Sequence, residues 1–365
     1  MHRKKILHFV SGLEVGGTET QLLRIVPLLQ EDLDNRVCCF SGRGPIGKLL
    51  EEKGVKVYYL DFKGRRDVFV YWRFGQVLRE YKPDILVTYL IHCDLIGRFL
   101  GRIFGVKKIV CSQRGSLLQW EFLRFFDRLT TFLVTKYLVQ TEVAKLELSK
   151  KLAIPEDRFF TIPNGIDLNE YDFPLDQEKK KLELGIPIEN NNIVCVSKLR
   201  RGKGHKYLLG AFENLYKERQ DINLLIVGDG EKRNDLNDQI KDYRSKSNIY
   251  FLGDRNDVKE ILRISDIFVL PTLGEGMSNA LLEAMASRKA IITTDIPQNK
   301  EMLTDGISAI FVPKNNSVKI TDSLLLLISN TGLEKELANN AYTSADKVFS
   351  INTIKRRVSN FLSSL

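Results

Sequence analysis

The sequence predicts an α/β protein built from two doubly wound parallel-sheet domains. Short apolar runs alternate with longer amphipathic stretches along the 365 residues, which is the βαβα order of such sheets. The apolar runs are rich in Val, Ile and Leu and do not alternate with polar residues, as expected of strands buried on both faces. The alternation pauses once, between about residues 168 and 191, so we expect two domains of similar size joined near residues 165–190.

The individual elements follow from this periodicity. Strands are expected in the first half at residues 5–10, 36–41, 55–60, 84–89, 107–112, 136–140 and 159–162. The second half repeats the pattern at 193–197, 222–227, 248–252, 266–270, 290–293 and 309–312. Helical stretches such as Thr18–Gln30 and Lys206–Arg219 separate most of the strands, and Tyr342–Leu365 is helical in pattern. Ligands of open α/β sheets bind beyond the carboxyl ends of the strands, so two such domains facing each other would form a deep cleft.

Composition narrows the class of partner. Hydrophobic residues make up 43% of the chain and charged residues 28%, which is typical of globular proteins. The net charge of +9 favours anionic partners such as phosphates, nucleic acid or an anionic membrane surface. Nucleic acid is disfavoured because the basic residues are scattered rather than gathered on one recognition element.

Targeting signals and cysteines indicate a cytoplasmic protein. The apolar run in Met1–Val10 is too short for a signal-peptide core, and no segment approaches the roughly 20 apolar residues of a membrane span. The five cysteines are odd in number, lack a C-x-x-C spacing and mostly sit in apolar runs. We therefore expect small buried hydrophobic side chains in a reducing compartment.

The most informative stretch is Glu275–Ala286. It places two carboxylates, Glu275 and Glu283, eight residues apart around a glycine turn and the start of an Ala/Leu/Met helix, after an apolar run that ends at Pro271. A strand, a polar turn and a helix N-terminus present free backbone N–H groups to a phosphate, and an ionised Glu accepts hydrogen bonds from sugar hydroxyls. The stretch indicates a nucleotide-sugar site. The alternative is an ordinary helix-start acid followed by a solvated helix face.

Two further loops in the second half support an anion site. The loop 197–204 begins at Ser197 and carries four cations, Lys198, Arg200, Arg201 and Lys203, a charge that suits a diphosphate. Gly228 and Gly230 flank Asp229 after another strand, where tight backbone geometry is expected. Asp229 could equally cap the following helix.

The first half contributes weaker candidates. Gly16 and Gly17 follow the first strand and open a helix; they form no G-x-G-x-x-G, which disfavours a nicotinamide cofactor, but they allow close approach of an anion or sugar. His92 follows a strand end and is expected in the cleft, although a structural histidine is at least an equal interpretation. Asp32-Leu33-Asp34, the only D-x-D, is read as a surface turn, and no His/Cys cluster has metal spacing.

The stretch Leu117–Leu133 combines aromatic and basic residues. It has two interpretations, which differ in whether its aromatic side chains are exposed or buried. The residues concerned are Trp120, Phe122, Arg124, Phe125, Phe126, Arg128 and Phe132. An interfacial amphipathic helix has this composition, and so does a core helix packed on the sheet, which is the favoured interpretation.

Taken together, the chain resembles the family 4 glycosyltransferases, retaining enzymes with two facing Rossmann-like domains, the GT-B fold. The resemblance covers nearly the whole chain and rests on five matches: the Gly16–Glu19 loop, Pro83–Ile85 with Leu95–Arg98, Ile162–Asp167, Val227–Gly230, and the E-x7-E motif at Glu275–Glu283. It implies an acceptor-side domain at residues 1–167 and a donor domain at 168–345. It also implies that a C-terminal helix at about 346–365 packs back on the first domain.

The resemblance also assigns roles. Lys203 would bind the donor diphosphate, together with Lys198, which stands where the family usually has Arg, and Glu275 would contact the transferred sugar. Glu283 would hold the ribose hydroxyls. The remaining candidate contacts to the nucleotide-sugar are Gly16, Gly17, Ser197, Gly228, Gly276, Met277, Ser278 and Asn279. Tyr89 stands where many members have a His near the sugar, so His92 is an open candidate for that role.

The expected function is therefore a retaining, metal-independent hexosyltransferase. It would move a hexose or N-acetylhexosamine from a nucleotide-sugar to a glycan or lipid-linked acceptor in surface polysaccharide or glycolipid synthesis. UDP is favoured over GDP on family frequency, no cofactor is expected, and the site would lie in the cytoplasm at the inner face of the membrane. The alternatives are a nucleotide-sugar epimerase of the same architecture and a non-catalytic sugar-nucleotide-binding subunit.

Overall fold

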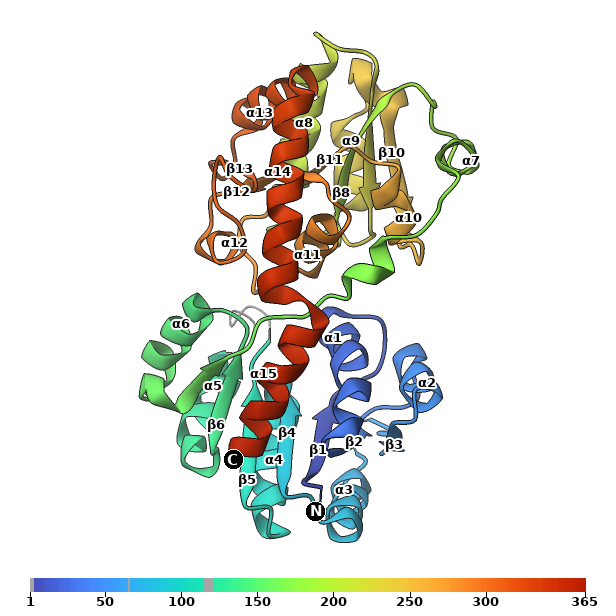
Figure 1. Ribbon diagram of the computed structural model, residues 1–365. Coiled ribbons are helices and arrows are strands. Elements are labelled where there is room, and N and C mark those ends of the chain that lie inside the picture. The colour runs from blue at the N-terminus through green and yellow to red at the C-terminus, as the bar shows by residue number, and fades with distance from the viewer. Residues whose placement is uncertain (1–2, 65, 115–120) are drawn as a thin grey trace. The chain divides into compact units, whose positions relative to one another are not determined.

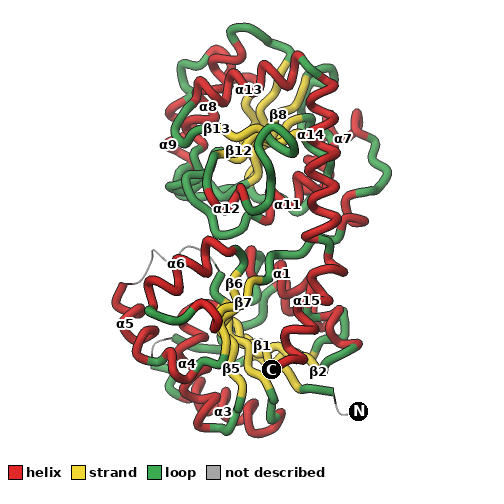
Figure 2. The backbone as a smooth tube through the Cα atoms, turned by 60° about the vertical axis from the view of Figure 1, so that its left-hand side comes forward, coloured by secondary structure: helices red, strands yellow, loops and turns green. Residues whose placement is uncertain are grey.

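The computed structural model describes residues 3–64, 66–114 and 121–365 and divides into two compact units. Unit 1 comprises residues 1–165 and 351–365, and unit 2 comprises residues 166–350. Each unit is a parallel sheet with helices on both faces (Figures 1 and 2). The predicted α/β class is confirmed.

Unit 1 contains a seven-stranded sheet in the order β3-β2-β1-β4-β5-β6-β7. Its strands are β1 (Lys5–Val10), β2 (Asp34–Cys39), β3 (Lys56–Tyr59), β4 (Ile85–Tyr89), β5 (Lys108–Ser112), β6 (Lys136–Val139) and β7 (Phe159–Thr161). Its helices are α1 (Gly17–Ile25), α2 (Pro45–Glu52), α3 (Phe69–Tyr81), α4 (Leu90–Ile103), α5 (Glu121–Leu129), α6 (Glu142–Leu152) and α15 (Ile351–Ser364). Short 3₁₀ turns lie at Pro27–Glu31, Thr131–Leu133 and Glu156–Arg158.

The sheet of unit 1 separates two apolar layers. One layer packs α1, α2 and α15 against the sheet through residues such as Leu22, Leu50 and Ile354. The other packs α3, α4 and α6 against the opposite face through Phe74, Cys93 and Leu148. Because both faces are covered, the strands carry apolar side chains in both directions, which explains their non-alternating sequence. All five cysteines of the chain are buried and free.

Unit 2 contains a six-stranded sheet in the order β10-β9-β8-β11-β12-β13. Its strands are β8 (Asn191–Val196), β9 (Ile222–Val227), β10 (Ile249–Gly253), β11 (Ile267–Leu270), β12 (Ala290–Thr294) and β13 (Ile310–Val312). Its α-helices are α7 (Gln177–Glu183), α8 (His205–Tyr216), α9 (Arg233–Gln239), α10 (Val258–Arg263), α11 (Asn279–Ala286), α12 (Pro297–Lys300), α13 (Ser317–Ser329) and α14 (Thr331–Ser344). Turns of 3₁₀ helix lie at Leu168–Tyr171 and Arg244–Asn248, and a π-helical turn follows α14 at Ala345–Phe349.

The stretch expected as a linker is folded into unit 2. Residues 168–191 contain α7, and its Lys180 ammonium lies 2.6 Å from the Asp257 carboxylate and also pairs with Glu260. These two contacts attach the helix to α10 and its N-cap residue. The proline and lysine content of the stretch predicted a linker. The partners that hold it against unit 2 lie about 80 residues away in sequence, so no local pattern could have predicted these contacts.

The C-terminal stretch expected as one helix is three segments. The π-helical turn ends at Ser350, whose extended backbone (ψ 142°) separates it from α15. Ile351 and Ile354 of α15 lie against Gly165, where an added Cβ would come within 3.0 Å of Ile351. The chain thus returns to unit 1, and α15 contacts α1.

Candidate functional site in unit 2

Three loops meet backbone to backbone at the carboxyl edge of the unit 2 sheet. Gly204, after β8, has φ 75°, and a Cβ there would lie 1.9 Å from the carbonyl oxygen of Pro271, which follows β11. Gly228, after β9, has φ 122°, and a Cβ there would lie 2.3 Å from the carbonyl oxygen of Ser197. Both positions require glycine, because a side chain would meet both a left-handed backbone and a rigid neighbour. The glycines therefore hold the predicted basic loop against its two neighbours.

A buried ion pair joins two of these loops. The Lys203 ammonium pairs with the Glu275 carboxylate, and their side chains are only 11% and 12% exposed. The loop that carries Lys203 is fixed by the Leu273 amide, which donates to the Gly202 carbonyl at 2.8 Å. A largely desolvated pair persists only when its geometry is maintained by the surrounding structure. Two predicted site residues, 72 positions apart, are thus brought into contact.

A neutral histidine lies beside this pair. His205, the first residue of α8, shares a 2.9 Å hydrogen bond between its Nε2 and Ser197 Oγ. Burial lowers the pKa of His205 to about 4, and the nearby Lys203 charge lowers it further in the same direction. The imidazole is therefore uncharged at neutral pH. Its role as partner of Ser197 was not predicted from the sequence.

Lys198 is held differently from Lys203. Its ammonium lies 2.7 Å from Asp254, which follows β10, but the two side chains are 59% and 61% exposed. Asp254 also accepts a hydrogen bond from the Asp229 amide at 3.1 Å, and Lys198 lowers the pKa of this carboxyl. An exposed pair of this kind contributes little to stability. Lys198 is therefore free to exchange Asp254 for another anion at small cost.

The helix that follows Glu275 begins as the sequence predicted. Ser278 is the N-cap of α11, and its Oγ accepts from the Leu281 amide at 3.3 Å. Met277 and Ser278 are buried, whereas Gly276, Asn279 and Glu283 are partly exposed. The amide groups at the start of this eight-residue helix provide a partial positive charge. Lys203 and Lys198, each paired with a carboxylate, lie on a neighbouring loop at the same carboxyl edge.

The remaining predicted candidates lie in unit 1. Gly16 is the N-cap of α1 and Gly17 its first residue, with Glu19 in the same turn. His92 lies exposed in the first turn of α4, after Leu90, whose φ of 68° turns the chain out of β4. The histidine thus lies beyond the carboxyl end of its strand, as predicted. Its role, like the nucleotide-sugar roles of Gly16 and Gly17, remains a prediction.

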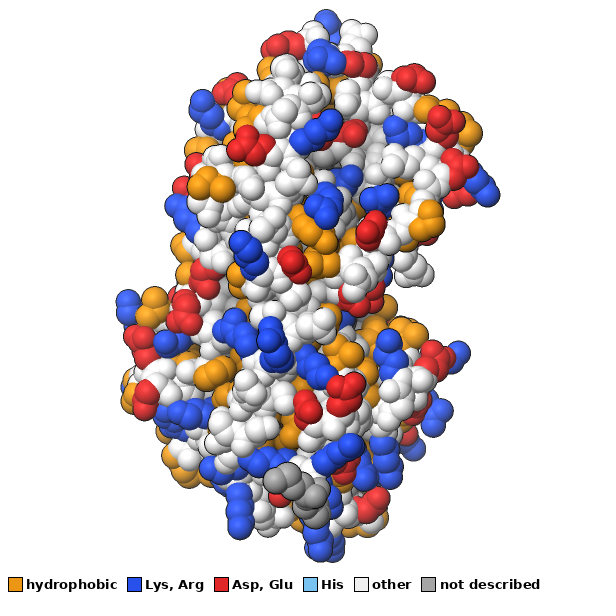
Figure 3. Space-filling model, viewed as in Figure 1, with side chains coloured by type: hydrophobic (Ala, Val, Ile, Leu, Met, Phe, Trp, Pro, Cys, Tyr) orange, Lys and Arg blue, Asp and Glu red, His pale blue; other side chains and the backbone are white. Residues whose placement is uncertain are grey.

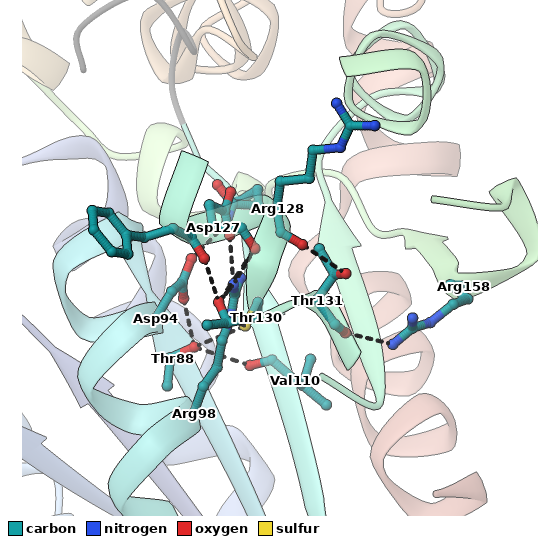
Figure 4. A network of polar contacts seen from close by, with 12 residues as sticks. Thr88, Asp94, Arg98, Val110, Asp127, Arg128, Thr130, Thr131 and Arg158 are labelled. Carbon is teal, nitrogen blue, oxygen red and sulfur yellow. Dashed lines mark hydrogen bonds and ion pairs between the residues drawn. The ribbon is translucent and has the colours of Figure 1, made fainter. Parts of the chain in front are cut away.

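A buried polar network in unit 1 escaped the sequence-based prediction (Figure 4). Thr88 Oγ1 lies 2.5 Å from one oxygen of Asp94, and Gln113 Nε2 lies 2.5 Å from the other. Arg98, one turn along α4, pairs with Asp127 of α5 at 2.5 Å. Burial raises the pKa of Asp94 to about 7. The network connects the ends of β4 and β5 to α4 and α5, and its members are spread too widely in the sequence to form a local motif.

The aromatic–basic stretch contradicts the core interpretation in the part that the structure describes. Phe125 and Phe126 of α5, Leu129 and Phe132 are all exposed, Phe132 by 75%. Residues 115–120, including Trp120, lie outside the described residues, as do the side chains of Phe122 and Arg124. The core interpretation fails for the described side chains of α5 because the buried one is the polar Asp127, which pairs with the buried Arg98.

Comparison with known proteins identifies the family. The model of Glycosyltransferase Family 4 matches residues 15–170, and the model of Glycosyl transferases group 1 matches residues 176–344. The chain is a family 4 glycosyltransferase. The two matches meet near the boundary between unit 1 and unit 2, so each unit of this glycosyltransferase corresponds to one family domain.

Two curated glycosyltransferases and one solved structure illustrate the likeness. UDP-Gal:alpha-D-GlcNAc-diphosphoundecaprenol alpha-1,3-galactosyltransferase of Escherichia coli is 26% identical, and the alignment covers 94% of each chain. A Campylobacter jejuni transferase, N,N'-diacetylbacillosaminyl-diphospho-undecaprenol alpha-1,3-N-acetylgalactosaminyltransferase, is 28% identical over 54% of this chain and 53% of its own. Anabaena Alr3699/HepE in complex with UDP-glucose superposes with a TM-score of 0.86 at 21% identity, covering 99% and 100% of the two chains. The last comparison supports the GT-B fold.

Proposed function

We propose that this glycosyltransferase moves a hexose or N-acetylhexosamine from a UDP-sugar to a diphosphate-linked lipid glycan, with retention of configuration and without a metal ion. The observation that carries the proposal is the largely enclosed Lys203–Glu275 pair at the carboxyl edge of the unit 2 sheet. The relatives from Escherichia coli and Campylobacter jejuni, whose names specify diphosphoundecaprenol-linked acceptors, support the acceptor class.

Lys203 would stabilise the leaving diphosphate. Cleavage of the sugar–phosphate bond develops negative charge on the phosphate, and preorganised donors in a partly desolvated site stabilise such charge strongly. Lys203 is already positioned by Glu275, and Lys198 can exchange its exposed partner. The amides of Gly276, Met277 and Ser278 lie directly before the first residue of α11. This arrangement supplies the positive charge that a divalent cation provides in other sites.

Glu275 is poorly suited to act as a nucleophile because its charge is engaged by Lys203. Retention by a covalent glycosyl–enzyme requires a free carboxylate close to the sugar. We therefore favour attack by the acceptor hydroxyl on the same face as the departing phosphate, with Glu275 binding the sugar. Glu283, partly exposed on α11, would accept hydrogen bonds from the ribose, so Glu283→Ala should lower UDP affinity in calorimetry.

A donor panel tests the proposal. The purified full chain is incubated with UDP- and GDP-linked hexoses and N-acetylhexosamines and an alkyl-diphosphate sugar acceptor, and released nucleotide is measured. We expect acceptor-dependent release of UDP. Conversion of the donor to its epimer without acceptor would identify the epimerase alternative, and UDP-sugar binding without turnover would identify the non-catalytic one.

We also propose that unit 1 binds an anionic membrane surface. Unit 1 carries 30 Lys and Arg residues against 18 Asp and Glu, a net charge of +12, whereas unit 2 carries 25 against 28, a net charge of −3. Figure 3 shows Lys and Arg side chains gathered over the lower part of the view, which is unit 1. Exposed Phe125, Phe126, Leu129 and Phe132 would add apolar contact. No helix in the described part of the chain is long and apolar enough to cross a bilayer.

Sedimentation with vesicles tests this contact. Each basic residue near an anionic surface contributes about 1 kcal/mol, so binding should be strong at low salt and weaken at high salt. Phe125→Ser with Phe132→Ser should reduce the salt-resistant fraction. If the fraction of protein left in the supernatant at low salt were the same with anionic as with neutral vesicles, the proposal would be wrong.

A further inference from the structure

The carboxyl edge of the unit 1 sheet holds an arginine, Arg114, that forms no ion pair with any residue whose side chain the structure describes. Arg114 follows β5 by two residues and is partly buried. Its Nε donates to Ser112 Oγ at 3.2 Å and its Nη1 donates to Asn164 Oδ1 at 2.9 Å, while its guanidinium carbon lies 5.8 Å from the centre of the Tyr89 ring. All three partners are neutral. No carboxylate among the described residues forms an ion pair with Arg114.

The arginines elsewhere in unit 1 differ in their partners, since the half-buried Arg102 and Arg158 donate to backbone carbonyl oxygens. Arg98 pairs with Asp127 and Arg73 with Asp67, each at 2.5 Å. Glu19, in the first turn of α1, is close enough to Arg114 for their charges to interact, but it forms no ion pair with it. Among the residues whose side chains the structure describes, Arg114 therefore has no ion-pair partner.

The neutral partners orient the guanidinium from four adjacent strand ends. Tyr89 ends β4 and Ser112 ends β5, whereas Asn164 follows β7. Asn164 Oδ1 also accepts from Gln140 Nε2 at 2.6 Å, and Gln140 follows β6. This convergence fixes the plane of the guanidinium without neutralising it. A group constrained in this way loses little conformational entropy when a ligand binds.

The free donors of Arg114 match a phosphate. A guanidinium has five N–H groups in a planar fork, and the hydrogen bonds of Arg114 to Ser112 and Asn164 use two of them. The other three have no bonding partner among the described residues. The fork geometry suits bidentate contact with phosphate oxygens. Burial lowers the pKa of Arg114, which is the expected cost of a charge that lacks its counter-ion.

We infer that Arg114 binds a phosphate of the acceptor substrate. The inference rests on the proposed function, in which the acceptor sugar is joined to its lipid through a diphosphate. The donor diphosphate has its own cations, Lys203 and Lys198, in unit 2. Arg114, a further cation at the carboxyl edge of the unit 1 sheet, would then serve the other substrate. Arg114 would make recognition of the acceptor depend on the charge of its aglycone as well as on its sugar.

Acceptors that differ only in the aglycone test the inference. The same sugar is presented as an alkyl diphosphate, an alkyl monophosphate and an uncharged alkyl glycoside to wild type, Arg114→Gln and Arg114→Lys. We expect Arg114→Gln to raise the KM for the diphosphate acceptor on the order of 10- to 100-fold, as for loss of a charged hydrogen bond. The KM for the uncharged glycoside and the KM for UDP-sugar should not change, and Arg114→Lys should recover part of the loss.

The matched control removes a cation at the opposite end of the same strand. Lys107 precedes β5 and is exposed, so Lys107→Gln should leave all three KM values unchanged. If Arg114→Gln lowered activity equally on all three acceptors, its role would be structural and the inference would be wrong. If Arg114→Gln raises the KM for the monophosphate acceptor as much as the KM for the diphosphate acceptor, Arg114 contacts one phosphate. A larger increase for the diphosphate acceptor indicates contact with both.

A binding measurement separates this inference from the proposed function. UDP-saturated protein, with its donor site occupied, is titrated calorimetrically with inorganic pyrophosphate. Binding by wild type that weakens at least 10-fold in Arg114→Gln supports the anion site even if no acceptor is glycosylated. Equal pyrophosphate affinity in the two proteins would overturn the anion site even if transfer to a lipid diphosphate occurs.

Discussion

At the scale of single residues, the two lysines of the candidate site in unit 2 are held in different ways. Lys203 is enclosed and paired with Glu275, whereas Lys198 forms an exposed pair with Asp254. Removal of one partner from an enclosed pair leaves an uncompensated charge, which is far more costly than loss of an exposed pair. The two lysines should therefore respond differently to substitution.

Lys203→Ala should remove most UDP binding and turnover, whereas Lys198→Arg should be tolerated. A charged contact in a partly desolvated site contributes about 2–4 kcal/mol, and the same substitution leaves Glu275 unpaired. Lys198→Arg keeps the charge and adds the fork that suits a diphosphate. Calorimetry with UDP and initial rates measure both variants. An inactive but folded Lys198→Arg protein would show that this loop does not bind the diphosphate as proposed.

At the scale of elements, the polar residues sit where strands end and helices begin. His205 opens α8 directly after the basic loop, and its neutral imidazole bonds Ser197 at the end of β8. Burial gives this histidine a folded-state pKa of about 4, compared with 6.5 for the free side chain. The unfolded chain therefore binds the proton more tightly, and folding stability is lost as pH falls from about 6.5 to about 4.

His205→Gln should make the free energy of unfolding less dependent on pH between about pH 6.5 and pH 4. The lowered pKa corresponds to a stability change on the order of 3 kcal/mol across the window. Urea unfolding of wild type and His205→Gln at several pH values measures it, and contributions common to both proteins, such as the opposite effect of Asp94, cancel in the difference. A constant difference between the two proteins from pH 7 to pH 4.5 would show that His205 does not carry this dependence.

Periodicity predicted the strands well because each is an uninterrupted apolar run buried on both faces. The expected strand at 222–227 coincides with β9, and that at 5–10 coincides with β1. The Glu275–Glu283 stretch could also be predicted from a local pattern, because its turn, N-cap and helix are contiguous in sequence. The pairing of Lys203 with Glu275 and that of Arg98 with Asp127 depend on tertiary contact. No local pattern could have predicted either pair.

The exposure of α5 shows a second limit of sequence patterns. Its aromatic residues were read as core because a buried helix and an interfacial helix have the same composition. The orientation was decided by Asp127, which pairs with the buried Arg98 and so directs the polar side of the helix inward. The described aromatic side chains of α5, Phe125 and Phe126, are exposed and could therefore contact a membrane surface.

At the scale of the whole molecule, the two units differ in charge and in the anion sites that they carry. Unit 1 has a net charge of +12 and contains Arg114, and unit 2 has a net charge of −3 and carries Lys198 and Lys203 at the carboxyl edge of its sheet. This division is what an enzyme with two anionic substrates requires if each unit binds one of them. The general charge of unit 1 would act at the membrane surface, and the local charge of unit 2 would act on the leaving group.

The most direct test of the central claim is the anomeric configuration of the product formed in the presence of EDTA. The full chain is treated with EDTA and supplied with a UDP-sugar and an alkyl-diphosphate sugar acceptor, and the new linkage is read by proton NMR alongside UDP release. The account predicts one UDP released per linkage formed, an undiminished rate, and a product with the anomeric configuration of the donor. Loss of transfer with EDTA that manganese restores, or an inverted linkage, would contradict it.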